Sequence, residues 1–331
     1  MLSALKKELR KTSSLNSFII ILFIIAAFTS SFCIGLAEES VLSSFDDAYS
    51  LETLLISVAQ YIIIIPILLV IHNIIRKGKK DTKVLNHLKK TSVSKGKIMK
   101  WIIISLSLTY IASYLSSFML AIIEEISDSK INVISLVAEP TLLGYIANIV
   151  GMFLLAPFFE ELLFRGMFFG EIKKYGSWFA ILVTGITFGL WHANIGQTLY
   201  TMVLGICASF LIAKTDSIIP CIILHGIFNL IGTIQSLTLS GLDLNKLAEQ
   251  SYIIDNVGKL FIIGVIGIII IAIIIIGLIF FIIEVCKYKE TFKFKDNCQL
   301  KKSQKIFAYF SSPVTIVLYL GMIALTIYNA I

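Results

Sequence analysis

The chain has 331 residues, of which 57% are apolar and only 15% are charged, and its mean hydropathy is +0.91. This balance excludes an ordinary soluble domain and is typical of a protein that crosses a membrane several times. The net charge of +7 comes from lysine clusters that contain no aromatic platform and no glycine-rich phosphate loop. We therefore expect membrane lipids as partners, and no nucleic acid.

An apolar stretch of roughly 20 residues is long enough to cross the hydrocarbon core of a bilayer as a helix. In chain order, the sequence contains about nine such stretches, at residues 17–37, 53–75, 101–123, 147–172, 177–195, 197–213, 218–238, 258–284 and 306–329. The sequence thus predicts an all-α fold, a polytopic bundle of about eight to nine transmembrane helices. No linker or internal repeat divides these stretches, so we expect residues 1–331 to form a single transmembrane domain.

Lysine and arginine residues gather in three segments outside the predicted spans, at residues 6–11, 76–100 and 287–305. All three fall on one side of the membrane if nine spans alternate in direction, and cytoplasmic loops carry the excess of positive charge. The prediction is a multi-pass protein of the cell membrane with its amino terminus in the cytoplasm. The bias toward lysine and isoleucine favours a bacterial source. The apolar run of the first span is long for a cleaved signal peptide, so we expect that span to be retained.

The fourth predicted span contains the stretch APFFEELLFRG, residues 156–166, with two carboxylates and an arginine. A charged side chain near a helix centre costs on the order of 2.5 to 3.5 kcal/mol, so these groups must pair or line a wet cavity. Glu161 and Arg165 are four residues apart and share one face of the helix, whereas adjacent residues diverge by about 100°. We predict that Glu161 and Arg165 form a buried structural ion pair and that Glu160 points elsewhere.

Two of the four histidines lie inside predicted spans, His192 in FGLWHANIG and His225 in LHGIFNL. Asn229 follows His225 by four residues, which places it on the same helix face about 6 Å further along. Phe188 precedes His192 by the same step and is expected to pack beside its ring. These side chains and Glu160 can meet in the bilayer interior from three helices.

The sequences EELLFR, FGLWH and HGIFN match the patterns EExxxR, FxxxH and HxxxN, in that order and on three apolar segments. In these motifs the chain resembles the CPBP family of CAAX-processing type II and bacteriocin-processing endopeptidases, also called the abortive-infection family. The resemblance covers residues 151–231, and the catalytic core helices are then expected within residues 147–238. It implies an intramembrane peptidase.

The resemblance implies that Glu160 is the general base that activates a water molecule, and that His192 helps to bind and position this water. His225 and Asn229 would form an oxyanion hole, while the ion pair of Glu161 and Arg165 would support the structure. The implied reaction is hydrolysis of a peptide bond in a hydrophobic, membrane-associated peptide or protein. In bacteria the family is linked to bacteriocin processing, self-immunity and peptide signalling, and a prenylated substrate is not expected.

The resemblance leaves the role of a metal open. If Zn²⁺ takes part, Glu160, His192 and His225 are its expected ligands, but the HExxH spacing of helical zinc hydrolases is absent. We expect that no cofactor is required.

Two other functions remain as alternatives. A proton-coupled or cation-coupled transporter would also use intramembrane Glu and His, although the sequence shows no paired halves with broken helices. A catalytically silent immunity or scaffold protein would keep the fold, although the complete set of four polar residues favours activity.

Overall fold

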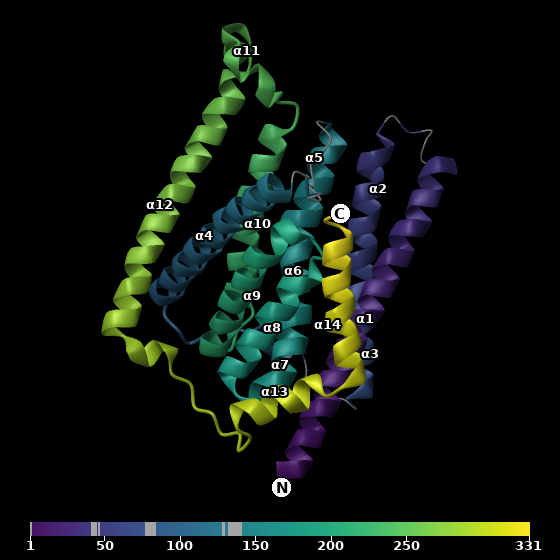
Figure 1. Ribbon diagram of the computed structural model, residues 1–331, viewed down its shortest axis with the longest axis vertical. Coiled ribbons are helices and arrows are strands. Elements are labelled where there is room, and N and C mark those ends of the chain that lie inside the picture. The colour runs from purple at the N-terminus through teal and green to yellow at the C-terminus, as the bar shows by residue number, and fades with distance from the viewer. Residues whose placement is uncertain (1, 41–44, 46, 77–83, 128–129, 132–140) are drawn as a thin grey trace.

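The computed structural model describes residues 2–40, 45, 47–76, 84–127, 130–131 and 141–331. Every regular element among these residues is a helix (Figure 1). The α-helices are α1 (Leu2–Ser40), α2 (Ala48–Ser57), α3 (Ile65–Ile75), α4 (Lys95–Ser127), α5 (Leu142–Asn148), α6 (Ala156–Glu161), α7 (Gly170–Ile172), α8 (Ser177–Trp191), α9 (Ile195–Thr215), α10 (Ile219–Leu239), α11 (Gln250–Asp255), α12 (Val257–Lys287), α13 (Lys302–Phe310) and α14 (Pro313–Tyr328). Three π-helical segments, η2 (Val58–Ile64), η5 (Ile149–Leu155) and η6 (Leu162–Phe169), and four 3₁₀ segments, η4 (Val84–His87), η7 (Lys173–Tyr175), η8 (Leu244–Ala248) and η9 (Lys289–Phe292), join them.

Long apolar helices dominate the described part of the chain. Seven of them are long and apolar enough to cross a membrane, and the bent pair α13 and α14 makes an eighth if it counts as one span. The seven are Leu2–Ala37, Ala48–Ile75, Lys95–Ser127, Leu142–Tyr175, Ile195–Thr215, Ile219–Leu239 and Val257–Lys287. The all-α, polytopic fold expected from the sequence is confirmed.

Two predicted spans take a different form from the one expected. Residues 177–195 form the 15-residue helix α8, a turn and the first residue of α9. Helix α8 is about 23 Å long, shorter than a hydrocarbon core of about 30 Å. Residues 306–329 are interrupted between α13 and α14, whose axes differ by 82°. Pro313 begins α14, because proline suits the first turn of a helix and disrupts an interior.

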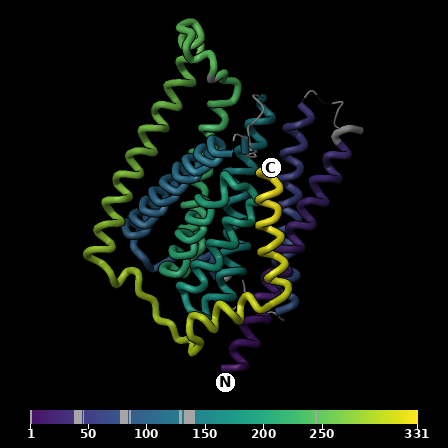
Figure 2. Tube along the Cα trace, in the orientation of Figure 1, coloured from purple at the N-terminus to yellow at the C-terminus, as the bar shows by residue number. Residues whose placement is uncertain are grey.

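The described parts of the three lysine-rich segments lie at one end of the bundle. Figure 2 shows the amino-terminal part of α1 and helix α13 at this end, opposite α11. Each segment contacts one of two neighbouring sites at this end, residues 173–174 and residues 214–216: Glu8 pairs with Lys174, Lys89 and Lys173 both pair with Asp216, and Lys214 donates to the carbonyl of Lys293. The expectation that the basic segments share one side is confirmed for these residues. That this side is cytoplasmic stays a prediction.

The centre of the bundle contains the helix that runs from α5 to η7, together with α8, α9 and α10 (Figure 1). Helices α8 and α9 pack closely because glycines face each other. A Cβ atom on Gly185 would lie 2.8 Å from the backbone nitrogen of Ile206, and one on Gly205 would lie 3.0 Å from the Cα atom of Gly185. Small residues allow such close approach between membrane helices. This approach brings the Gly205 carbonyl toward the middle of the bundle.

The helix with the two glutamates is not a regular α-helix. The π-helical segments η5 and η6 flank α6, which contains Glu160 and Glu161. Pro157 lies in the first turn of α6, just as Pro66 lies in the first turn of α3 after η2. Proline has no N–H to donate to the preceding turn, and a π turn accommodates such a change in hydrogen bonding. Both helices therefore change their pitch close to the glutamates.

Candidate active site

Glu161 and Arg165 form the buried ion pair that their spacing predicts. Arg165 Nη1 lies 2.9 Å from Glu161 Oε1, and both side chains are 0% exposed. Arg165 Nη2 donates to the Gly205 carbonyl at 3.1 Å, and the guanidinium group lies 4.5 Å from the centre of the Phe188 ring. The planar fork of arginine can make these contacts together, which a lysine ammonium cannot. Arg165 thus connects its own helix with α8 and α9.

Glu161 has a second partner, which the sequence did not predict. His225 Nδ1 lies 3.0 Å from Glu161 Oε1, the same oxygen that Arg165 contacts, and His225 is buried. An ionised carboxylate only accepts hydrogen bonds, so Nδ1 of His225 carries the proton of this contact. Glu161 therefore orients His225 as well as neutralising Arg165.

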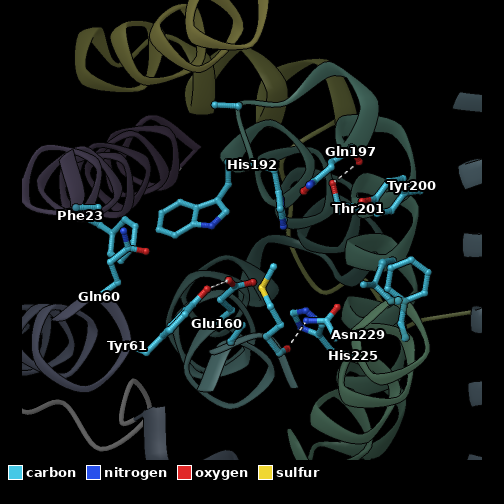
Figure 3. Close-up of a pocket in the computed structure, with 18 of the residues that line it drawn as sticks. Phe23, Gln60, Tyr61, Glu160, His192, Gln197, Tyr200, Thr201, His225 and Asn229 are labelled. Carbon is cyan, nitrogen blue, oxygen red and sulfur yellow. Dashed lines mark hydrogen bonds between the residues drawn. The ribbon is translucent and has the colours of Figure 1, made fainter. Parts of the chain in front are cut away.

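Glu160 points away from the ion pair and toward η2. The hydroxyl of Tyr61 donates to Glu160 Oε1 at 2.9 Å (Figure 3). The other carboxylate oxygen, Oε2, is buried and has no hydrogen-bond partner among the described residues. Because a buried carboxylate oxygen needs a donor, this atom is the natural place for a water molecule or a substrate group.

His192 lies at the carboxyl end of α8, where the chain turns into α9. Its Nδ1 is 2.8 Å from the carbonyl of Phe188, and its ring packs edge-on to the Phe188 ring at 5.0 Å, as the spacing predicts. A carbonyl only accepts, so Nδ1 donates and Nε2 is left as an acceptor. Figure 3 shows the ring pointing into the space above Glu160.

The turn after His192 is tightly constrained. Ala193 has a positive φ of 45°, a conformation that costs a non-glycine residue about 1–2 kcal/mol. Its carbonyl accepts a hydrogen bond from Asn329 at the end of α14, 2.8 Å away. Asn194 then caps α9 by accepting from the backbone nitrogen of Gly196. These contacts hold the backbone at His192.

Asn229 lies one turn beyond His225 on α10, as predicted. Its Nδ2 donates to the carbonyl of Met152 at 2.7 Å, and Met152 belongs to the π-helical segment η5. An amide group has two N–H bonds, so one stays available to another acceptor. The contact with Met152 fixes the orientation of the amide.

One cavity of about 690 Å³ is lined by Glu160, His192, His225 and Asn229. Pockets of this size hold small ligands or a few residues of a peptide. The cavity also has polar residues (Gln60, Asn148, Gln197, Thr201, Ser236 and Asn329) and apolar walls (Phe23, Ile24, Ala27, Trp191, Tyr200, Phe228, Met322 and Leu325). Its apolar walls come in part from α1 and α14.

The residues expected to hold a metal, should one take part, are not arranged as a metal site. Among the residues that the structure describes, no three His, Cys, Asp or Glu side chains are grouped closely enough to bind a metal ion. His225 directs Nδ1 to Glu161, which leaves only Nε2 of this ring as a possible ligand atom. That no cofactor is required stays a prediction.

Tyr61 is a residue of the site that sequence reasoning missed. It lies in the apolar stretch 53–75, which has the pattern of a plain membrane span. The available signal was the polar pair Gln60-Tyr61 in the sequence SVAQYIIIIP, close to a proline. The pair gives no indication of its partner, because Glu160 is 99 residues away along the chain.

Comparison with known proteins yields a family and one relative. Residues 142–231 match the family described as "Type II CAAX prenyl endopeptidase Rce1-like", which confirms over this segment the resemblance seen in the three motifs. A Bacillus subtilis (strain 168) protein described as "Putative membrane peptidase YdiL" is 29% identical over 112 residues, which are 34% of this chain and 44% of that protein. The match thus spans less than half of the relative's length. No solved structure matches the chain.

Both matches are to proteins described as peptidases, and with the long apolar helices they support a multi-pass membrane protein of bacterial type.

Proposed function

We propose that the protein is an intramembrane endopeptidase in which Glu160 activates a water molecule for hydrolysis of a peptide bond. The observation that carries this proposal is the meeting of Glu160, His192 and Asn229 at one cavity, from three separate helices. The carboxylate has one oxygen without a partner among the residues described, the imidazole has an available nitrogen, and the amide has an available N–H.

In the proposed reaction, the water molecule donates one hydrogen bond to Glu160 Oε2 and the other to His192 Nε2. Both atoms are acceptors, so the lone pair of the water oxygen is directed at the carbonyl carbon of the substrate. As the new C–O bond forms, Glu160 takes a proton from the water, and the π electrons of the carbonyl move to its oxygen. Glu160 then gives this proton to the leaving nitrogen as the electron pair on the negative oxygen re-forms the carbonyl and the C–N bond breaks, which produces a carboxylic acid and an amine.

The negative oxygen of the intermediate needs hydrogen-bond donors. The second N–H of Asn229 is one such donor, and preorganised donors of this kind are worth about 10²–10³ in rate. His225 can donate from Nε2 only when both ring nitrogens carry protons, because Nδ1–H is already bound to Glu161. The oxyanion role of His225 therefore requires an imidazolium, for which the Glu161 carboxylate is the buried partner.

The apolar walls of the cavity support a hydrophobic, membrane-associated peptide or protein as the substrate. Maturation of a bacteriocin-like or signalling peptide is the biological setting that the family resemblance favours. A silent scaffold has no need of a constrained His192 and an available Glu160 oxygen facing the same cavity.

The test is a comparison of the peptide termini of membrane proteins and secreted peptides from cells that express the wild type or Glu160→Gln at equal levels. We expect a set of termini that is present with the wild type and absent with Glu160→Gln. Glu125→Gln, an exposed carboxylate on α4, is the matched control and should behave as the wild type. Identical termini in all three strains would refute the protease function. Ion flux in vesicles that Glu160→Gln abolishes would indicate a carrier instead.

A further inference from the structure

The carboxylate proposed as the base is held by a side chain from outside the segment that matches the family. Tyr61 lies in η2, within the long helix Ala48–Ile75, whereas the family match covers residues 142–231. The hydroxyl of Tyr61 donates to Glu160 Oε1 at 2.9 Å, and both residues line the cavity (Figure 3). A catalytic role for this contact rests on the proposed function, because it acts on the proposed base.

This hydrogen bond makes the two carboxylate oxygens of Glu160 different. The terminal torsion of a glutamate is broad and roughly two-fold, so a free carboxylate presents either oxygen in many orientations. With Oε1 bound to Tyr61, the plane of the carboxylate is set and Oε2 is the oxygen left for water. A misplacement of about 1 Å between reacting groups can lower a rate about 100-fold. A single hydrogen-bond donor to Oε1 can therefore control a reaction that takes place at Oε2.

The position of Tyr61 is itself firmly held. Ile65 and Leu68, one and two turns further along the helix, are buried in the core at 0% and 5% exposure. The π-helical segment η2 directly precedes α3, where Pro66 lies in the first turn. Packing of the apolar residues against the bundle fixes the distance between Tyr61 and Glu160, and the altered helix pitch directs the phenol toward α6.

We propose that Tyr61 is a positioning residue, whose hydroxyl holds Oε1 of Glu160 so that Oε2 faces the attacking water. It acts through Glu160 and makes no bond to the reacting atoms. A merely structural tyrosine would fill space, and phenylalanine would replace it without loss of turnover.

The first test compares Tyr61→Phe with Tyr110→Phe. Tyr110 is buried, and its hydroxyl has no hydrogen-bond partner among the described residues, so its loss removes a phenol oxygen from the bundle without touching Glu160. The probe is a synthetic peptide that spans the terminus most strongly lost in Glu160→Gln cells, cleaved by purified protein in lipid vesicles. We expect Tyr61→Phe to lower kcat about 100-fold and to leave KM within about 3-fold. Tyr110→Phe should match the wild type, and 3-fluorotyrosine at position 61, which keeps the hydroxyl, should restore kcat.

The second test needs no substrate. The Tm change caused by Tyr61→Phe is measured in the wild type and in Glu160→Ala. If the hydrogen bond exists, the effect of Tyr61→Phe is reduced or absent in Glu160→Ala, because its partner is already gone. Equal Tm changes in the two backgrounds would mean that the two side chains do not interact, and the proposal would be overturned whatever the activity.

The two proposals fail in different ways. Peptide termini that depend on Glu160 but form at the wild-type rate in Tyr61→Phe would remove the positioning role and leave the protease function intact. A loss confined to KM would do the same, since it would place Tyr61 in substrate binding. Termini that do not depend on Glu160 would remove the protease function and the role of Tyr61 with it.

Discussion

Replacing Arg165 by leucine would remove the cation of an ion pair in which both side chains are fully buried. Among the described residues, Glu161 would then keep only His225 as a partner, and the Gly205 carbonyl would lose its side-chain donor. Removal of one member of a buried pair costs about 3–5 kcal/mol, because the remaining charge stays buried without compensation. Glu160→Gln, in contrast, still accepts the Tyr61 hydrogen bond through its amide oxygen, and we expect it to cost less than about 1 kcal/mol.

The assay is the folded yield in mild detergent, measured by size-exclusion chromatography, together with a thermal scan of the folded fraction. We expect Arg165→Leu to lose most of its folded yield and Glu160→Gln to stay near the wild type. Arg165→Lys should recover only part of the loss, because an ammonium group cannot hold Glu161 and the Gly205 carbonyl in the same planar geometry.

A double variant tests the reason for the loss. Glu161→Leu with Arg165→Leu leaves no uncompensated charge from the pair, so it should fold better than Arg165→Leu alone. Equal yields for Arg165→Leu and Glu160→Gln would refute the division of roles between the two glutamates. A double variant that folds worse than Arg165→Leu would refute the argument from uncompensated charge.

Three further outcomes are expected. Gly185→Ala should destabilise the protein by about 1–3 kcal/mol in thermal scans, since its Cβ would clash with the backbone of α9, whereas Gly258→Ala, with open space around it, should be neutral. Asn229→Ala should keep the fold and lower kcat about 100-fold with little change in KM, and an effect confined to KM would contradict its oxyanion role. Burial, with nearby lysines, lowers the pKa of His87 in the folded protein below its ordinary value of 6.5. As the pH falls below 6.5, the unfolded chain binds a proton at His87 more readily than the folded protein does, so the folded protein loses stability until the pH is below the folded-state pKa as well. The Tm of His87→Gln should therefore fall less than the Tm of the wild type between pH 7 and pH 5. An equal fall in both proteins would contradict this role of His87.

Much of the site could be predicted because its signals are local. Residues four apart share a helix face whatever the rest of the chain does, so the Glu161–Arg165 pair and the packing of Phe188 on His192 followed from spacing. Apolar length likewise predicts membrane helices, because the bilayer sets the number of residues needed. The same spacing rule predicted that Glu160 points away from the Glu161–Arg165 pair.

The two predicted spans that differ from the structure, residues 177–195 and 306–329, depend on where helices end. An apolar stretch shows that a segment prefers lipid or core, but it does not show that the helix continues through it. The chain leaves helix α8 at the turn of Ala193, which is held by Asn329 from the end of α14, and a sharp bend precedes Pro313. The proline was visible in the sequence, whereas the contact with Asn329 joins residues 136 positions apart.

What the amino-acid sequence determined by itself is the class of protein, its membrane helices and the identity of the motif residues, since each of these is set by composition or by spacing within one helix. Only the tertiary structure decided which oxygen of Glu160 is bound and which is available, and that Glu161 has His225 as a second partner. These contacts join separate helices, and their geometry depends on helix packing, on π turns and on the close approach of glycines. No short-range sequence pattern predicts such packing, because it depends on the arrangement of all the helices in the bundle.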